Sequence, residues 1–167
     1  NKNKDLIKVL NKFQYKSKLY LVPFKEIQDE IIKNVDSKYR MIVYRRFMFL
    51  IAEEIARKEN TSALLSGENL GQVASQTLEN LKVIEDVSNI PVLRPLITYD
   101  KEEIVNISKK IGLYEISILP YGDCCSYFIA EHPTTKADLN LIKKFEDKLA
   151  IKRLVNNSIN NVEVINL

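Results

Sequence analysis

The chain has 167 residues, a usual length for one domain and long enough to bury a sizeable core. Its 25 basic and 22 acidic residues give a net charge of +3, which permits a nucleic-acid partner without demanding one. No apolar run approaches the ~18 residues of a membrane-spanning helix, and the start, Asn-Lys-Asn-Lys-Asp, has no signal-peptide pattern. We therefore expect a cytoplasmic protein with no membrane partner.

Helix and strand patterns alternate at the start of the chain. Apolar side chains recur at helical spacing over residues 4–13 and again over residues 24–35, which predicts two amphipathic helices. Between them, residues 19–22 form a continuous apolar run that ends at Pro23. Such a run is typical of a strand buried on both faces of a parallel sheet.

A third helix is predicted over residues 36–59, with an N-cap at its first residue and apolar side chains on nearly all sides over residues 41–52. Arg45 falls within this apolar surface, where an unpaired charge would be very unfavourable. Arg45 therefore forms either an internal salt bridge or a contact with an anionic ligand in a cleft. Arg46 has Glu53 on its side of the helix and is expected to be more solvated.

Residues 63–81, ALLSGENLGQVASQTLENL, combine a short apolar strand, a glycine turn and the start of a helix. A glycine turn between a strand and a helix can direct several backbone N–H groups at a phosphate or another anion. Gly67 and Gly71 also fit an ordinary connection, and neither GxGxxG nor GxxxxGK[ST] occurs. The spacing of the two glycines leaves both readings open.

The next elements continue the alternation. Residues 92–97 predict another strand, which should lie at a sheet edge because Pro95 has no N–H to donate. Asp100 and Glu103 have the spacing of a capping box. They predict the start of a helix that ends at Gly112, a residue favoured just beyond a helix C-terminus.

Residues 113–136 look irregular and contain both cysteines and the only histidine, and long ordered loops are often functional. Cys124 and Cys125 are adjacent, too close for an ordinary disulfide, and together with one histidine they do not make a zinc site, so no metal centre is predicted. A helix over residues 138–149 and a short closing strand over 162–167 complete the pattern. The alternation of helices and short apolar strands along the chain predicts an α/β fold with a parallel sheet flanked by helices.

The string GENLGQVASQTLENL, followed by PVLRPLITYDKEEI, closely resembles the catalytic domain of the tRNA 4-thiouridine synthetases, also called ThiI thiamine biosynthesis proteins. These belong to the PP-loop ATP pyrophosphatase superfamily. The similarity runs from the first helix to about Lys136 and is densest from Gly67 to Ile118. It implies a PP-loop fold, which is Rossmann-like and of the adenine nucleotide alpha hydrolase type, and it makes residues 1–167 the C-terminal part of that catalytic domain.

The motif that names the superfamily, Ser-Gly-Gly-x-Asp-Ser, does not occur in these residues. Residues 1–13 resemble the family's helix after its second strand, so we expect the first strands and the PP-loop upstream. The strands at 18–22 and 63–66 would then have open edges. We expect the gap to be filled by another chain, by a domain swap or by closing up of the sheet.

The resemblance implies an ATP-dependent tRNA sulfurtransferase. Such an enzyme adenylates a tRNA uridine and replaces its oxygen with cysteine-derived sulfur to give 4-thiouridine, and it can also supply sulfur for thiamine thiazole synthesis. The expected cofactor is ATP, with Mg²⁺ bound to it. The expected partners are tRNA and a persulfide sulfur donor, either a cysteine desulfurase or a rhodanese-like carrier.

Carried over position by position, the family's adenylate contacts fall on Arg45, Gly67 and Gln76, and its catalytic cysteine falls on the pair Cys124 and Cys125, with Cys125 favoured. We expect Arg45 to point into a cleft shared with the Ser66-Gly67 turn, and Cys125 to be reachable from solvent. The alternative is a non-catalytic nucleotide- or tRNA-binding module, because the PP-loop motif does not occur. For the same reason the isolated chain is expected to have little ATP pyrophosphatase activity.

Overall fold

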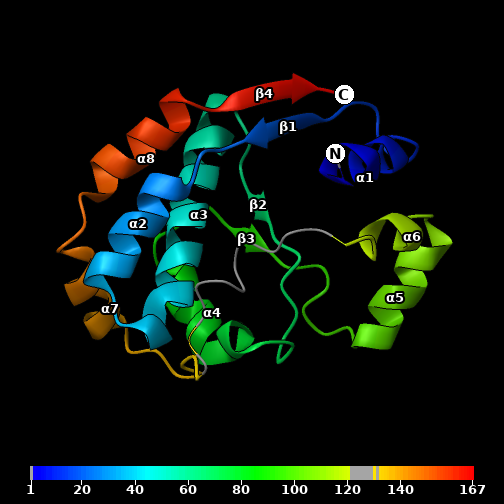
Figure 1. Ribbon diagram of the computed structural model, residues 1–167. Coiled ribbons are helices and arrows are strands. Elements are labelled where there is room, and N and C mark those ends of the chain that lie inside the picture. The colour runs from blue at the N-terminus through cyan, green and yellow to red at the C-terminus, as the bar shows by residue number, and fades with distance from the viewer. Residues whose placement is uncertain (1, 121–129, 131) are drawn as a thin grey trace.

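The computed structural model describes residues 2–120, 130 and 132–167 (Figure 1). The helices and strands alternate along the chain, as an α/β fold requires. The α-helices are α1 (Lys2–Leu10), α2 (Lys25–Asn34), α3 (Arg40–Lys58), α4 (Leu78–Glu85), α5 (Lys101–Lys110), α6 (Tyr114–Ser117), α7 (Leu139–Glu146) and α8 (Ile151–Asn160). The strands are β1 (Lys18–Leu21), β2 (Leu64–Leu65), β3 (Val92–Leu93) and β4 (Glu163–Asn166), and two 3-10 turns are η1 (Ser37–Tyr39) and η2 (Ala74–Gln76).

The described strands form two separate two-stranded sheets. β2 pairs in parallel with β3, as expected, whereas β1 pairs antiparallel with β4, with Leu19 opposite Ile165. The prediction that residues 19–22 form a parallel strand buried on both faces is therefore wrong. An apolar run does not reveal its partner, and here the partner is the closing strand predicted over 162–167, which is confirmed as β4.

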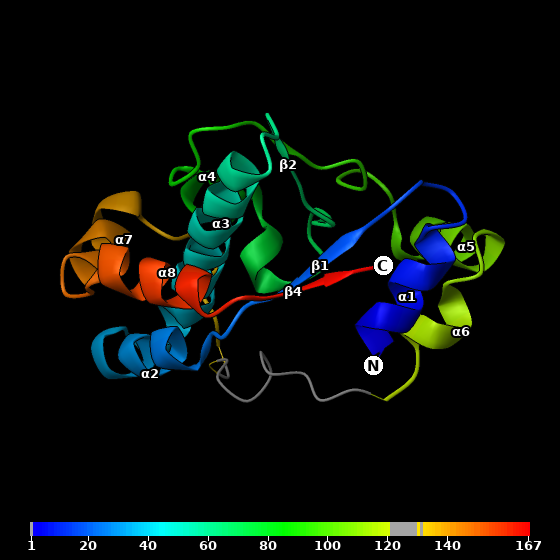
Figure 2. The same cartoon turned by 90° about the horizontal axis from the view of Figure 1, so that it is seen from above.

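The core is built around α3. Its apolar side chains pack against α2, α4 and α8, and the fully buried ones include Ile42, Val43 and Phe47. In Figures 1 and 2, α2, α7, α8 and α4 surround α3, and α1, α5 and α6 gather on the far side of the β1–β4 ribbon. None of the three helices in that second group has a fully buried residue. The hydrophobic core therefore lies in the α3 group.

Local chemistry fixes several helix ends. The capping box is confirmed, because the Asp100 side chain accepts from the Glu103 N–H and the Glu103 side chain accepts from the Asp100 N–H. Gly112 follows the C-cap of α5 with φ +76°, which a glycine adopts without strain. Asp36 is confirmed as a cap, but of η1, so α3 begins only at Arg40.

β3 is shorter than predicted. The strand expected over residues 92–97 ends at Leu93, because the chain then turns and the Ile97 N–H bonds to the Arg94 carbonyl. Within the described residues β3 pairs only with β2, in agreement with an edge position next to Pro95. None of the described helices is both long enough and apolar enough to cross a membrane.

Candidate functional site

The connection from β2 to α4 is not the simple glycine turn that was predicted. α4 begins at Leu78 with Thr77 as N-cap, whose hydroxyl accepts from the Asn80 N–H, so Gly67 does not lead directly into a helix. Gly67 therefore does not stand at the N-terminus of a helix, the position that one of the two readings of this turn required. Residues 66–77 connect β2 to α4. This connection turns at Gly71, where φ is +77°, and contains the 3-10 turn η2.

Arg45 and Gly67 lie on the same cavity, which has a volume of about 330 Å³. The expectation that Arg45 shares a cleft with the Ser66-Gly67 turn is confirmed. A Cβ added at Gly67 would meet open space, so the backbone of this turn is accessible. The cavity is lined from α3 by Arg45, Met48, Phe49 and Ala52 and from the β2 side by Leu64, Leu65, Ser66 and Gly67.

Arg45 also forms the internal salt bridge that was the alternative reading. Its Nη2 lies 2.5 Å from Oε1 of Glu68, a carboxylate that is only 1% exposed. The Arg45 side chain keeps an exposed fraction of 21%. One edge of the guanidinium is thus paired, and the side chain still reaches the cavity.

The second carboxylate oxygen of Glu68 binds another arginine. Arg94 Nε lies 2.6 Å from Glu68 Oε2, and Arg94 Nη1 lies 2.6 Å from Glu85 Oε2. Burial lowers the pKa of Arg94, but the hydrogen bonds to Glu68 and Glu85 outweigh it and raise that pKa above the usual arginine value. The sequence analysis did not identify Glu68 or Arg94 as site residues, although Arg94 interrupts an apolar run as Arg45 does.

The prediction that Arg46 is solvated is wrong, because its side chain is buried. Its guanidinium bonds to both carboxylate oxygens of Glu146, at 2.7 and 2.9 Å, and to the Val83 carbonyl. Glu53, the expected partner, instead accepts from the backbone N–H and the side chain of Asn89. Arg46 therefore joins α3 to α7 and takes no part in the cavity.

Gln76 lies in η2 and is not among the residues that line the Arg45 cavity. Its backbone carbonyl accepts from the Gly71 N–H at 2.9 Å. Its side-chain Oε1 is buried and has no hydrogen-bond partner among the described residues. A buried acceptor without a partner is uncommon in folded proteins and calls for an explanation.

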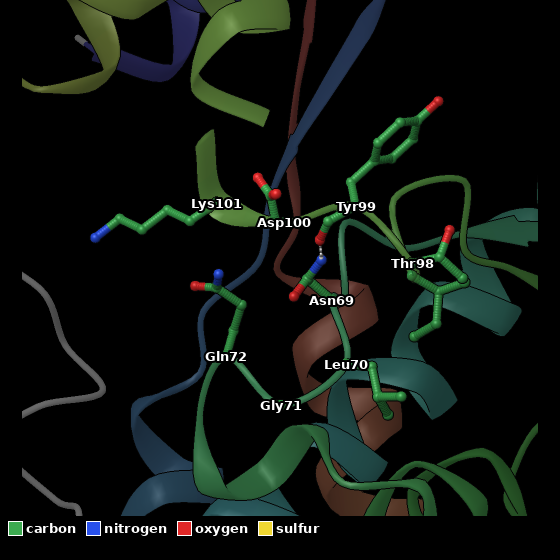
Figure 3. Close-up of a pocket in the computed structure, with 9 residues that line it drawn as sticks. Asn69, Leu70, Gly71, Gln72, Thr98, Tyr99, Asp100 and Lys101 are labelled. Carbon is green, nitrogen blue, oxygen red and sulfur yellow. Dashed lines mark hydrogen bonds between the residues drawn. The ribbon is translucent and has the colours of Figure 1, made fainter. Parts of the chain in front are cut away.

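A second cavity, of about 500 Å³, opens between the loops that follow β2 and β3 (Figure 3). Its walls are residues 69–72 and 97–101. The Asn69 side chain ties the two walls together by donating to the Leu96 and Tyr99 carbonyls. The second cavity thus lies beyond the carboxyl ends of the parallel strands, the usual place for ligands in open α/β sheets, whereas the Arg45 cavity lies between α3 and β2 with the turn after it.

Cys124 and Cys125 lie outside the described residues. The segment that follows them is held by Asn80, which is fully buried. Its amide group donates to the Ala74 and Thr134 carbonyls and accepts from the Ala137 N–H. Asn80 therefore joins residues 134–137 to the loop that carries Gln76. No group of His, Cys, Asp and Glu side chains that could hold a metal ion occurs among the described residues.

The comparisons with known proteins agree with one another. A family model described as "Thiamine biosynthesis protein (ThiI)" matches residues 1–151. The chain is 47% identical over 163 residues to a "Probable tRNA sulfurtransferase" of Acetivibrio thermocellus and 46% identical over 164 residues to one of Thermus thermophilus. Both matches cover 98% of this chain but only 42% and 40% of the relatives, so the chain spans about two fifths of their length.

A solved structure is similar over nearly the whole chain. It is described as a crystal structure of a 4-thiouridine synthetase–RNA complex with bound ATP. The TM-score is 0.94 and the sequence identity is 42%. The match covers 99% of this chain and 44% of the other.

Proposed function

Because the chain belongs to the family of ThiI thiamine biosynthesis proteins, we propose that it forms the adenylate-binding side of an ATP-dependent tRNA sulfurtransferase. The product of this enzyme is 4-thiouridine in tRNA. The names of the relatives favour this enzyme over the non-catalytic nucleotide- or tRNA-binding module that the missing PP-loop motif raised as an alternative.

The reaction exchanges an oxygen for a sulfur. The uridine oxygen is a poor leaving group, and transfer of AMP from ATP to that oxygen, with release of pyrophosphate, lets it depart with AMP. The outer sulfur of a cysteine persulfide displaces AMP from the base, and a second cysteine thiol then cleaves the S–S bond, so that the sulfur stays on the base and the two cysteines form a disulfide. The protein must therefore hold the adenylate, present the uridine and supply a reactive cysteine.

The observation that carries the proposal is the cavity shared by Arg45 and Gly67. Its volume of about 330 Å³ falls in the range of small-molecule sites. Apolar side chains from α3 and β2 line it, which suits the faces of a nucleobase, and Arg45 supplies hydrogen-bond donors at its edge. The accessible backbone at Gly67 lets a ligand approach closely. These residues fit an adenylate.

Gln76 is the third proposed adenylate contact. Its buried Oε1 has no partner among the described residues, and an amino group of the ligand would satisfy it. This contact requires that the ligand extend from the cavity towards η2. Mg²⁺ would be held chiefly by the ATP phosphates, since it often binds proteins through one or two carboxylates only.

The other partners follow from the chemistry. The similar structure holds RNA and ATP, and we propose tRNA and ATP as the corresponding ligands here. Cys125, or Cys124 beside it, receives sulfur from a persulfide donor, either a cysteine desulfurase or a rhodanese-like carrier. The same sulfur relay would serve thiazole synthesis for thiamine, as the family description indicates.

The test is the conversion of unmodified tRNA to 4-thiouridine by the full-length gene product, with ATP and a persulfide donor. Mass spectrometry of the digested nucleosides measures the product. We expect 4-thiouridine that depends on ATP and on the sulfur donor. Nucleotide or tRNA binding without any 4-thiouridine would instead support the non-catalytic module.

A further inference from the structure

We infer that Glu68 is a positioning residue that fixes the guanidinium of Arg45 at the edge of the nucleotide cavity. Glu68 directly follows Gly67, so the turn that lines the cavity also carries the carboxylate that holds Arg45. The inference rests on the proposed function, because it assumes that Arg45 contacts the adenylate. It adds a residue that acts on the nucleotide only through another side chain.

The burial of Glu68 points to a specific task. An ionised carboxylate with 1% exposure is strongly unfavourable unless cations and hydrogen bonds compensate it. Each of its oxygens is taken by a different arginine, at 2.5 Å by Arg45 and at 2.6 Å by Arg94. Because Glu68 is only 1% exposed and does not line the cavity, a ligand does not reach its carboxylate, and its effect on a ligand must pass through Arg45.

Arg94 holds the carboxylate oxygen of Glu68 that Arg45 does not bind. Arg94 is not among the cavity-lining residues, and its Nη1 binds Glu85 on α4 at 2.6 Å. The chain of ion pairs from Arg45 through Glu68 and Arg94 to Glu85 connects α3, the segment after β2, the end of β3 and α4. An arginine side chain has many rotamers, and these pairs select one of them before the ligand arrives.

Charge gives a second reason for this arrangement. Two arginines and two glutamates sum to a formal charge of zero, so the cluster does not attract anions at long range. Arg45 then acts through directed N–H donors, whose value depends on orientation. Loss of Glu68 should therefore weaken nucleotide binding by misplacing Arg45, although it leaves the positive charge of Arg45 in place.

The test is a double-mutant cycle on ATP affinity in the full-length gene product, measured by isothermal titration calorimetry. The variants are Glu68→Gln, Arg45→Gln and the pair combined, each with its thermal midpoint. We expect each single variant to lose about tenfold in affinity. The combined variant should lose no more than Arg45→Gln alone, because a positioning residue has nothing left to position.

Glu79→Gln is the matched control. It removes an exposed carboxylate from the same helix, α4, and leaves all four side chains of the ion-pair cluster in place. We expect an ATP affinity within about twofold of the wild type, since an exposed surface charge contributes little. If Glu68→Gln does not fold, Glu68→Asp takes its place in the cycle. Aspartate keeps the charge, but its side chain is one methylene shorter and reaches the two arginines less well.

The outcomes separate the two claims. Independent, additive losses for Glu68→Gln and Arg45→Gln would overturn the positioning role, as would wild-type affinity in Glu68→Gln. Absence of ATP binding in the wild type, or wild-type affinity in Arg45→Gln, would instead overturn the assignment of the adenylate to this cavity, and the inference with it.

Discussion

Arg46 on α3 and Glu146 on α7 lie 100 positions apart and form a buried, two-point ion pair at 2.7 and 2.9 Å. The neighbouring Arg45 lines the cavity that it shares with Gly67. Successive residues on an α-helix point about 100° apart, so adjacent arginines reach different surroundings. One stabilises the packing of α7 against α3, and the other is available to a ligand.

The first prediction concerns that ion pair. Glu146→Gln should lower the free energy of unfolding by about 3 kcal/mol, the low end for a broken buried ion pair, because it removes the two-point partner of Arg46 and leaves only the Asp86 carboxylate at 3.5 Å. Urea unfolding measures the change. Arg57→Gln, which removes exposed ion pairs on the same helix, should change it by less than about 1 kcal/mol. Equal effects of the two variants would contradict the assignment.

The second prediction concerns Gln76 and has opposite signs for stability and binding. Gln76→Leu removes a buried oxygen without a described partner, so the thermal midpoint of the free protein should stay the same or rise. ATP affinity should fall about tenfold, because the ligand loses an acceptor. Calorimetry and thermal unfolding of the same samples measure both. A variant that loses stability but keeps ATP affinity would show that Gln76 serves only the fold.

The third prediction concerns acid stability and Glu53. Burial raises the pKa of Glu53, but the hydrogen bonds from the Asn89 backbone and side chain outweigh it and lower that pKa below its usual 4.5. A carboxyl group whose pKa is lower in the folded state stabilises the fold above the unfolded-state pKa and loses this contribution as pH falls through the folded-state pKa. The stability advantage of the wild type over Glu53→Gln should therefore be constant above about pH 6 and shrink below about pH 4.5.

Urea unfolding across this pH range measures that advantage. Glu79→Gln, on the exposed face of α4, is the control and should show no such trend. An advantage that grows as the pH falls would contradict the sign of the Glu53 shift.

The fourth prediction concerns the cysteines. In the full-length gene product, Cys125→Ser should abolish 4-thiouridine formation and leave tRNA adenylation intact, because adenylation precedes sulfur transfer. Adenylation is followed by pyrophosphate release and sulfur transfer by nucleoside mass spectrometry. Cys124→Ser is the matched control and should retain activity. The reverse pattern would assign the reactive thiol to Cys124.

The parts of the fold that depend on local chemistry were predictable. Asp100, Glu103 and Gly112 fix the two ends of α5 through neighbouring residues, so their spacing was sufficient. Arg45 was recognisable because a cation in an apolar helix surface needs a partner or a cleft, and the structure supplies both. In each case the decisive interaction was local or followed from burial.

The parts that depend on distant partners were not predictable. Arg46 was misassigned because its partner, Glu146, is remote in sequence. The path of residues 66–77 is set by tertiary bonds, including those of Asn69 to the turn after β3, which no glycine spacing reveals. Glu68 escaped notice for the same reason, since a glutamate in a polar segment gives no sign that two arginines will enclose it.

The most direct test of the account is the ATP affinity of Gly67→Val in the full-length gene product, measured by isothermal titration calorimetry. A Cβ added at Gly67 has no heavy atom within 4 Å other than those of its chain neighbours, so we expect the variant to keep the wild-type thermal midpoint. The valine would occupy space at the cavity lined by Arg45 and Gly67. Arg45→Ala, measured in parallel, should weaken ATP binding by about 1.5–3 kcal/mol, the scale of a charged hydrogen bond. The account predicts that Gly67→Val loses at least this much affinity while remaining folded; a folded Gly67→Val with wild-type ATP affinity would show that the adenylate binds elsewhere.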